Sequence, residues 1–170
     1  MSDDLLQKML NHFVIDGRLR SCISGTHAVT DGNCLLDFLP LVLGNRIPYE
    51  IREKMMTALC KDGGYLSSNG FATESVSSPY YISNGYWRGP IWAPSTWLLI
   101  YGLRECGEKE LALLTAKRFC DMCAKEGFAE NFDAVTGEGL RDRAYTWTSS
   151  IFLLLANFLL EEENERPLST

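Results

Sequence analysis

Hydrophobic residues recur at intervals of three and four along most of this chain, which is the spacing that places side chains on one face of an α-helix. This pattern predicts six helices, over residues 3–14, 33–43, 48–60, 91–105, 109–126 and 146–162. Glycines follow three of these segments, at positions 44, 107 and 127, as they commonly do at helix ends. No segment shows the strong alternation that predicts a β-strand.

Two long stretches of the chain lack this period. Residues 61–92 contain turn-forming pairs such as Gly63–Gly64 and Asn69–Gly70, and residues 127–145 separate the last two predicted helices. Connections of this length are uncommon in a compact domain unless they are functional or disordered. Aromatic residues are plentiful in the first stretch, which argues against disorder.

Short links connect the other helices. The links at residues 43–48 and 105–109 favour antiparallel helix pairs. The long stretches then gather at one end of the pairs, as in an αα-toroid, where helices build the wall and one rim carries the chemistry. We therefore expect an all-α chain whose αα-hairpins form a single partial toroid domain over residues 1–170, with loops 61–92 and 127–145 on the functional rim.

Charge narrows the range of partners. The net charge of −6, from 22 acidic and 16 basic residues, argues against nucleic acid or an anionic membrane surface, because both attract clustered lysine and arginine. The apolar run at residues 151–160 is too short to span a bilayer, which needs about 20 residues. A neutral or weakly charged ligand fits this composition better.

Six cysteines and two histidines are the residues most able to bind a metal. The first residues show neither the basic start nor the apolar run of a secretory signal, so we expect reduced thiols in a cytoplasmic protein. Cys120 and Cys123 have CxxC spacing, but they fall within a predicted helix and no second pair accompanies them. His12 and His27 show no metal-ligand spacing. Core thiols are the better interpretation than a zinc or redox site, and no metal or cofactor is expected.

Aromatic and charged residues are concentrated in the two long stretches and at their borders. Aromatic rings stack on the apolar faces of sugars, and carboxylates and arginine hold sugar hydroxyls through charge-assisted hydrogen bonds. The residues concerned are Tyr86, Trp87, Trp92, Phe132 and Trp147, with Glu74, Arg88, Glu130, Asp133, Glu138 and Asp142. Any one of them can equally be a core or loop-anchoring residue, but their concentration favours a carbohydrate site.

Two sequence blocks carry a resemblance to a known family. GYWRGPIWAPSTWLLIYGL, followed by FAENFDAVTGEGLRDRAYTWTSSIFLLLA, resembles the C-terminal part of the (α/α)6-barrel glycosidases, with glycoside hydrolase family 63 and the glycogen-debranching glucosidases nearest and trehalase more distant. LLDFLPLVLGNRIPYEI and GFATESVSSPYY resemble the stretch that precedes the first block in these enzymes. The resemblance covers about residues 30–155 and implies about half of a toroid.

The resemblance also implies a reaction and roles for residues. It implies inverting hydrolysis of an α-glycosidic bond in an oligosaccharide, in which one carboxylic acid protonates the leaving oxygen while a carboxylate activates water on the opposite face. Glu130 stands where the family has its general base. The remaining expected substrate contacts are Trp87 and Arg88 in the sugar subsite, Trp92 and Trp147 beside them, and Glu138 and Glu74 as hydroxyl partners.

One departure from the family matters more than the matches. A complete barrel has twelve helices, and its general acid is an aspartate on a hairpin that precedes everything aligned here, so no aspartate of this chain matches it. We therefore expect a fragment that carries the base without the acid and is inactive by itself. We also expect the face left open by the missing N-terminal half of the barrel to be covered by that half or by self-association.

Two other classes of function remain open. A non-catalytic carbohydrate-binding or helical scaffold domain would use the same aromatic residues, and Glu130 would then only accept a hydroxyl hydrogen bond. An isoprenoid-type toroidal enzyme also uses αα-hairpins, but it would need aspartate clusters or a zinc triad, which this sequence does not show.

Overall fold

Helices form most of the chain, and the computed structural model describes residues 2–29 and 34–165. The helices of this part are α1 (Ser2–Phe13), η1 (Leu35–Arg46), α2 (Tyr49–Cys60), α3 (Ala93–Glu105), α4 (Lys109–Glu126) and α5 (Thr146–Asn164). Each predicted helix is present, with ends that differ by a few residues. The start predicted at residue 33 lies outside the described residues. The all-α prediction is confirmed.

The second helix, η1, differs from the prediction in type. It is a 3₁₀-helix with Pro40 inside it, and it continues past Gly44 to Arg46. Proline has no backbone N–H to donate and clashes with the preceding turn of an α-helix, so the tighter 3₁₀ turns are favoured. At Gly44 φ is 52°, and an added Cβ would lie 2.6 Å from Cβ of Glu105 in α3. This glycine therefore kinks the segment and allows it to approach α3.

Two short hairpins occur where the sequence predicted no strand. β1 (Val14–Ile15) pairs with β2 (Arg18–Leu19), and β3 (Asn131–Phe132) pairs antiparallel with β4 (Gly139–Leu140). Strands of two residues are too short to produce a recognisable alternation. The segment predicted as loop 127–145 is therefore partly a hairpin.

The turn of the second hairpin is built around Asp133. Its Oδ1 accepts hydrogen bonds from the backbone N–H groups of Val135 at 2.7 Å and Thr136 at 2.9 Å. Its carbonyl accepts from the N–H of Gly137 at 2.9 Å. A carboxylate that satisfies the backbone in this way stabilises a tight turn. Asp133, a candidate for sugar contact in the sequence, here orders the hairpin.

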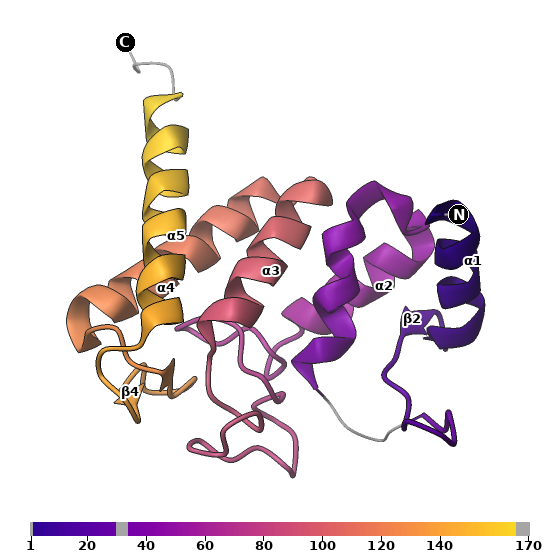
Figure 1. Cartoon of the computed structure of the whole chain (residues 1–170), viewed down its shortest axis with the longest axis horizontal. Helices are drawn as coiled ribbons and strands as arrows, with labels where there is room; N and C mark the ends of the chain where they lie inside the picture. Colours follow the sequence, from indigo (N-terminus) through magenta and orange to yellow (C-terminus); the bar gives the residue numbers. More distant parts are fainter. Residues whose placement is uncertain (1, 30–33, 166–170) are drawn as a thin grey trace.

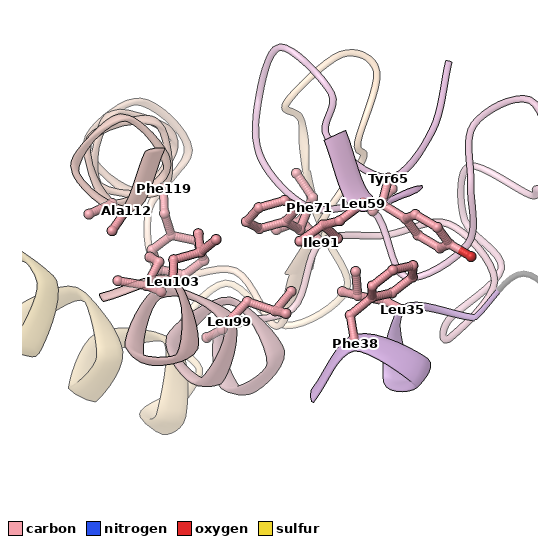
Figure 2. Packing of buried hydrophobic residues seen from close by; sticks show 14 of the residues in the cluster. Leu35, Phe38, Leu59, Tyr65, Phe71, Ile91, Leu99, Leu103, Ala112 and Phe119 are labelled. Carbon is pink, nitrogen blue, oxygen red and sulfur yellow. The ribbon is translucent and has the colours of Figure 1, made fainter. Parts of the chain in front are cut away.

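The hydrophobic core surrounds α3, which contacts η1, α4 and α5. Leu99, Ile100 and Leu103 on this helix are fully buried. Figure 2 shows that the core continues from α3 into the long loop, where Phe71 and Ile91 lie beside Leu59 of α2. The long loop is thus anchored by its own buried side chains.

The two long loops, residues 61–92 and 127–145, lie on the same side of the helices (Figure 1) and are termed the rim loops. Backbone hydrogen bonds run in both directions between Ile91 and Phe132, at 2.7 and 3.0 Å. Within the first loop, the Thr73 hydroxyl donates to the carbonyl of Pro90 at 2.9 Å and accepts from the N–H of Gly89 at 3.1 Å. The segment around Pro90 is therefore held from two directions.

Across residues 2–29 and 34–165, no helix combines the length and the apolar character that a membrane span requires.

We predict that Gly102→Ala destabilises the fold. An added Cβ would lie 2.8 Å from the carbonyl carbon of Leu41 and 2.9 Å from the backbone nitrogen of Val42 in η1. Alanine gains about 0.5–1 kcal/mol of helix propensity over glycine, but overpacking against main chain costs about 1–3 kcal/mol. Denaturant unfolding should show a net loss of about 1–2 kcal/mol, and Thr57→Ala on the exposed face of α2 should change stability by less than about 0.5 kcal/mol. A Gly102→Ala variant as stable as the wild type would contradict this close approach.

Candidate functional site

Trp92, the residue that precedes α3, is the centre of a cluster of five aromatic residues. The Trp92 and Trp87 rings are stacked, with centroids 4.7 Å apart and planes 7° apart. Tyr86 and Trp147 meet Trp92 edge-on, at 4.7 and 5.7 Å, and Tyr145 lies 5.2 Å from Trp147. These five residues are the aromatic cluster. They come from the loop before α3 and from the start of α5, so the fold brings the two rim loops together here.

Trp92 is the buried centre of this cluster. Its side chain is 0% exposed, and its indole Nε1 donates a hydrogen bond to the carbonyl of Tyr86 at 2.9 Å. Pro94, at the first turn of α3, fixes the chain direction just after it. Direct contact between Trp92 and a ligand would require its ring to be uncovered. In this arrangement Trp92 supports its neighbours.

The outer rings of the cluster remain accessible. Trp87 is 37% exposed and Trp147 is 39% exposed, and Tyr86 is exposed as well. Tyr86 has a φ of 61°, a left-handed conformation that is uncommon for a residue with a side chain. The turn that imposes it is closed by a hydrogen bond from the N–H of Ile82 to the carbonyl of Arg88 at 2.7 Å. Flat rings held at fixed angles with one face in solvent are suited to stack on a sugar.

Glu130 lies in the segment that is hydrogen-bonded to the start of α5. It is half-buried, and its N–H donates to the carbonyl of Asp142 at 2.7 Å. Burial raises the pKa of Tyr145, and the charges of Glu130, Tyr86 and Asp142 raise it further. The carboxylate is therefore within electrostatic reach of the cluster.

Two hydrogen bonds fix the backbone of the two residues that precede Glu130. The Thr148 hydroxyl donates to the carbonyl of Ala129 at 2.7 Å, and the N–H of Tyr145 donates to the carbonyl of Phe128 at 2.8 Å. Both donors belong to the start of α5 or the residue before it. The first turn of α5 thus positions the segment that carries the carboxylate.

Arg88 extends into solvent beside Trp87. Its guanidinium lies 5.6 Å from the centroid of the Tyr80 ring. Within residues 2–29 and 34–165, no ion pair or side-chain hydrogen bond holds it. Its hydrogen-bond donors are therefore available to a ligand at the rim.

Two other predicted contacts lie elsewhere. Glu138 is exposed in the β3–β4 turn. Glu74 is only 5% exposed, and its Oε1 has no hydrogen-bond partner among the described residues. Its electrostatic neighbours are Cys34 and Tyr65, whose pKa values are raised mainly by burial and also by Glu74. No contact among the described residues joins Glu74 or Glu138 to the aromatic cluster.

An open cavity of about 870 Å³ lies beside the cluster, between the first turns of α3 and α5. Its wall includes Tyr145 and Trp147 of the cluster, Asp142, and Trp97 of α3. Glu130, Trp87 and Arg88 are outside this wall, although Asp142 is the residue that accepts the hydrogen bond from Glu130. In the described part of the chain, no group of three or more potential ligands is placed to hold a metal ion.

Three further residues, Tyr145, Arg141 and Asn131, belong to this candidate site although the sequence pattern did not indicate them. Tyr145 belongs to both the cluster and the cavity. Arg141 donates to the side chain of Asn131 and lies over the ring of Tyr86. The available signal was proximity in sequence, because Tyr145 stands two residues before Trp147 and Asn131 follows Glu130.

Comparison with known proteins decides the family. Residues 1–148 match the family model described as "Mannosylglycerate hydrolase MGH1-like glycoside hydrolase domain". The chain belongs to this family. The relationship to the glycosidases that the sequence blocks indicated is therefore confirmed.

Named relatives of this MGH1-like glycoside hydrolase chain are longer. A mannosylglycerate hydrolase from Rubrobacter radiotolerans is 38% identical over 117 residues, covering 66% of this chain and 26% of that protein. A mannosylglycerate hydrolase from Thermus thermophilus is 28% identical over 116 residues, covering 68% of this chain and 28% of that protein. The chain thus spans about a quarter of the length of the curated relatives it matches.

A solved structure has the same fold. A GH63 mannosylglycerate hydrolase from Thermus thermophilus, in complex with glucose, superposes with a TM-score of 0.74 and 23% identity, over 85% of this chain and 37% of that one. This likeness confirms the predicted fold class, αα-hairpins that form part of an (α/α)6 toroid.

We predict that Glu130→Gln lowers the pKa of Tyr145. The carboxylate disfavours the tyrosinate by charge repulsion, so its removal makes deprotonation easier, although burial keeps the pKa above its usual range. Titration of tyrosine labelled with ¹³C at Cζ, followed by NMR, measures this directly. Glu138→Gln is the matched control and should leave Tyr145 unchanged. Equal titration curves for the wild type and Glu130→Gln would show that the carboxylate lies away from the cluster.

Proposed function

We propose that this chain forms the part of an inverting α-glycosidase that carries the general base, Glu130. The supporting observation is a half-buried carboxylate, Glu130, within electrostatic reach of Tyr145 in a partly exposed aromatic cluster, in a member of a glycoside hydrolase family. In this reaction Glu130 takes a proton from the water that attacks the anomeric carbon. A separate acid, on the opposite face of the sugar and about 6.5–9.5 Å away, protonates the leaving oxygen.

The aromatic cluster supplies the sugar platform in this proposal. Trp87 and Trp147 offer ring faces to solvent, and Trp92 holds them from behind. Arg88 is free to donate hydrogen bonds to hydroxyls or to an anionic group of the substrate. Glu138 and Glu74 remain predicted hydroxyl partners, and Glu74 would have to leave its buried position to act as one.

The substrate is proposed from the relatives. Because these are named mannosylglycerate hydrolases, mannosylglycerate is the first candidate, and the α-linked glucose oligosaccharides expected from the sequence are the second. A glycerate group carries a carboxylate, which an arginine at the rim can hold. The net charge of −6 gives no long-range attraction for such an anion, so recognition would depend on this local cation.

We predict that the chain by itself hydrolyses neither mannosylglycerate nor maltose, isomaltose, nigerose or aryl α-glucosides at a significant rate. A base without its acid loses roughly 10²–10⁴-fold in rate. Product assays on the wild type and on Glu130→Gln measure this. Turnover that the Glu130→Gln substitution abolishes would reveal an acid within this chain, and turnover that survives it would remove Glu130 from the proposed role.

A non-catalytic carbohydrate-binding or scaffold role makes a different prediction for the same residue. In a catalytically complete protein containing this chain, Glu130→Gln should abolish hydrolysis while sugar affinity changes little. If Glu130 only accepts a hydroxyl hydrogen bond, the same substitution should weaken affinity, and no hydrolysis should be present to lose.

We further propose that the remaining helices of a toroid cover apolar side chains that this chain exposes. The exposed leucines on α4 and α5 are Leu114, Leu153, Leu154 and Leu160. Exposed apolar groups of this kind drive association when their partner is absent.

We predict self-association of the isolated chain for this reason. Light scattering after size exclusion should give a mass above that of the monomer, and Leu153→Lys with Leu154→Lys should lower it. Thr57→Lys, on the exposed face of α2, is the control and should leave the mass unchanged. A sharp monomer without binding of a hydrophobic dye would contradict the prediction.

A further inference from the structure

Arg141, the residue directly after β4, touches both rim loops. Its Nη1 donates to Oδ1 of Asn131 at 3.1 Å, and its Nη2 donates to the carbonyl of Asn84 at 3.2 Å. The centre of its guanidinium lies 5.0 Å from the centroid of the Tyr86 ring. We propose that Arg141 is a positioning residue, which fixes β3 and the preceding Glu130 relative to the loop that carries Trp87. This inference rests on the function proposed above.

The contact on the Glu130 side dictates how Asn131 is oriented. Arginine has donors and no acceptor, so Asn131 must turn its amide oxygen toward Arg141. Its Nδ2 then points away, where it is buried and has no hydrogen-bond partner among the described residues. A buried donor without a partner is unfavourable, and the hydrogen bond from Arg141 keeps the amide in this orientation. The residue that directly follows Glu130 is thereby held in one conformation.

The contact on the aromatic side involves two left-handed residues. Arg141 has a φ of 63° and Tyr86 a φ of 61°, and the guanidinium of one lies over the ring of the other. Such conformations are unfavourable for residues with side chains and persist where surrounding contacts determine them. Tyr86 in turn receives the hydrogen bond from the indole of Trp92. Arg141 therefore contacts Tyr86, and Tyr86 contacts Trp92 at the centre of the aromatic cluster.

The chemistry of these contacts calls for a guanidinium. Its planar fork can donate in two directions while its face lies on an aromatic ring, which a lysine ammonium cannot reproduce. These contacts also distinguish Arg141 from Arg88, because the Arg141 donors are engaged with the protein. Loss of Arg141 is expected to change the position of Glu130, the proposed base. Displacement of a catalytic group by about 1 Å can lower the rate about 10²-fold.

The test uses the whole chain and two reporters that need no substrate. The first is the exchange rate of the Trp92 indole proton, assigned in ¹⁵N NMR spectra with Trp92→Phe, which reports on the aromatic side. The second is the fall in the Tyr145 pKa caused by Glu130→Gln, measured with and without Arg141, which reports on the position of the carboxylate. Arg143→Ala is the matched control, because Arg143 is exposed and pairs with Glu126 at 3.7 Å.

Arg141→Ala should accelerate exchange of the Trp92 indole proton about tenfold, as expected when a protecting contact is lost. It should also reduce the Glu130-dependent fall in the Tyr145 pKa by about half, as expected for coupled sites. Arg143→Ala should change neither. Guanidinium ion, added at concentrations too low to unfold the protein, should partly restore the indole exchange rate and the Tyr145 pKa change in Arg141→Ala.

Arg141→Lys keeps the charge and provides a second test if Arg141→Ala fails to fold. Its Trp92 indole exchange rate and its Glu130-dependent fall in the Tyr145 pKa should lie between those of the wild type and of Arg141→Ala. Wild-type values in a folded Arg141→Ala protein, or in Arg141→Lys, would overturn the inference. Such a result would leave the proposed function intact, because that function is tested by the effect of Glu130→Gln on hydrolysis in a catalytically complete protein that contains this chain.

Discussion

The reciprocal backbone pairing of Ile91 and Phe132 is the interaction on which the candidate site depends. Its two hydrogen bonds, 2.7 and 3.0 Å long, join loops that are far apart in the sequence. Both side chains are fully buried, and Phe132 meets Phe119 of α4 edge-on at 5.8 Å. Ile91 directly precedes Trp92, and Phe132 follows Glu130 by two residues. One pairing therefore sets the separation between the aromatic cluster and the carboxylate, and connects both to the helices.

The aromatic cluster shows how a rim made of loops becomes ordered. Loops are usually the mobile and variable parts of a fold. Here a fully buried indole, Trp92, supports the partly exposed rings of Trp87 and Trp147. When the rings are already held in place, ligand binding costs less conformational entropy, because the protein side chains do not have to be ordered at that moment. The buried ring of Trp92 thus holds in place the partly exposed rings that a ligand would contact.

The helices were predictable from sequence because their hydrophobic period extends over several turns. The 3₁₀ geometry of η1 was not, although Pro40 within it carried the necessary signal. The family resemblance singled out Glu130 and the tryptophans, and the two long loops were recognisable because they lack a helical period. They could not reveal that Glu74 is buried beside Cys34 and Tyr65, because those neighbours come from separate segments. The contacts of Arg141 with Asn84 and Tyr86 also required the folded chain.

The left-handed backbone at Tyr86 and Arg141 has a consequence for how this rim can change during evolution. Glycine, asparagine and aspartate adopt that backbone most readily, whereas β-branched residues rarely do. Replacement by glycine, asparagine or aspartate would suit the backbone but would remove the ring of Tyr86 or the guanidinium of Arg141. Replacement by another aromatic or basic residue would keep similar chemistry but would retain the backbone strain. Drift at these two positions is therefore confined to a narrow set of amino acids, even though both lie at the surface, where substitution is ordinarily permissive.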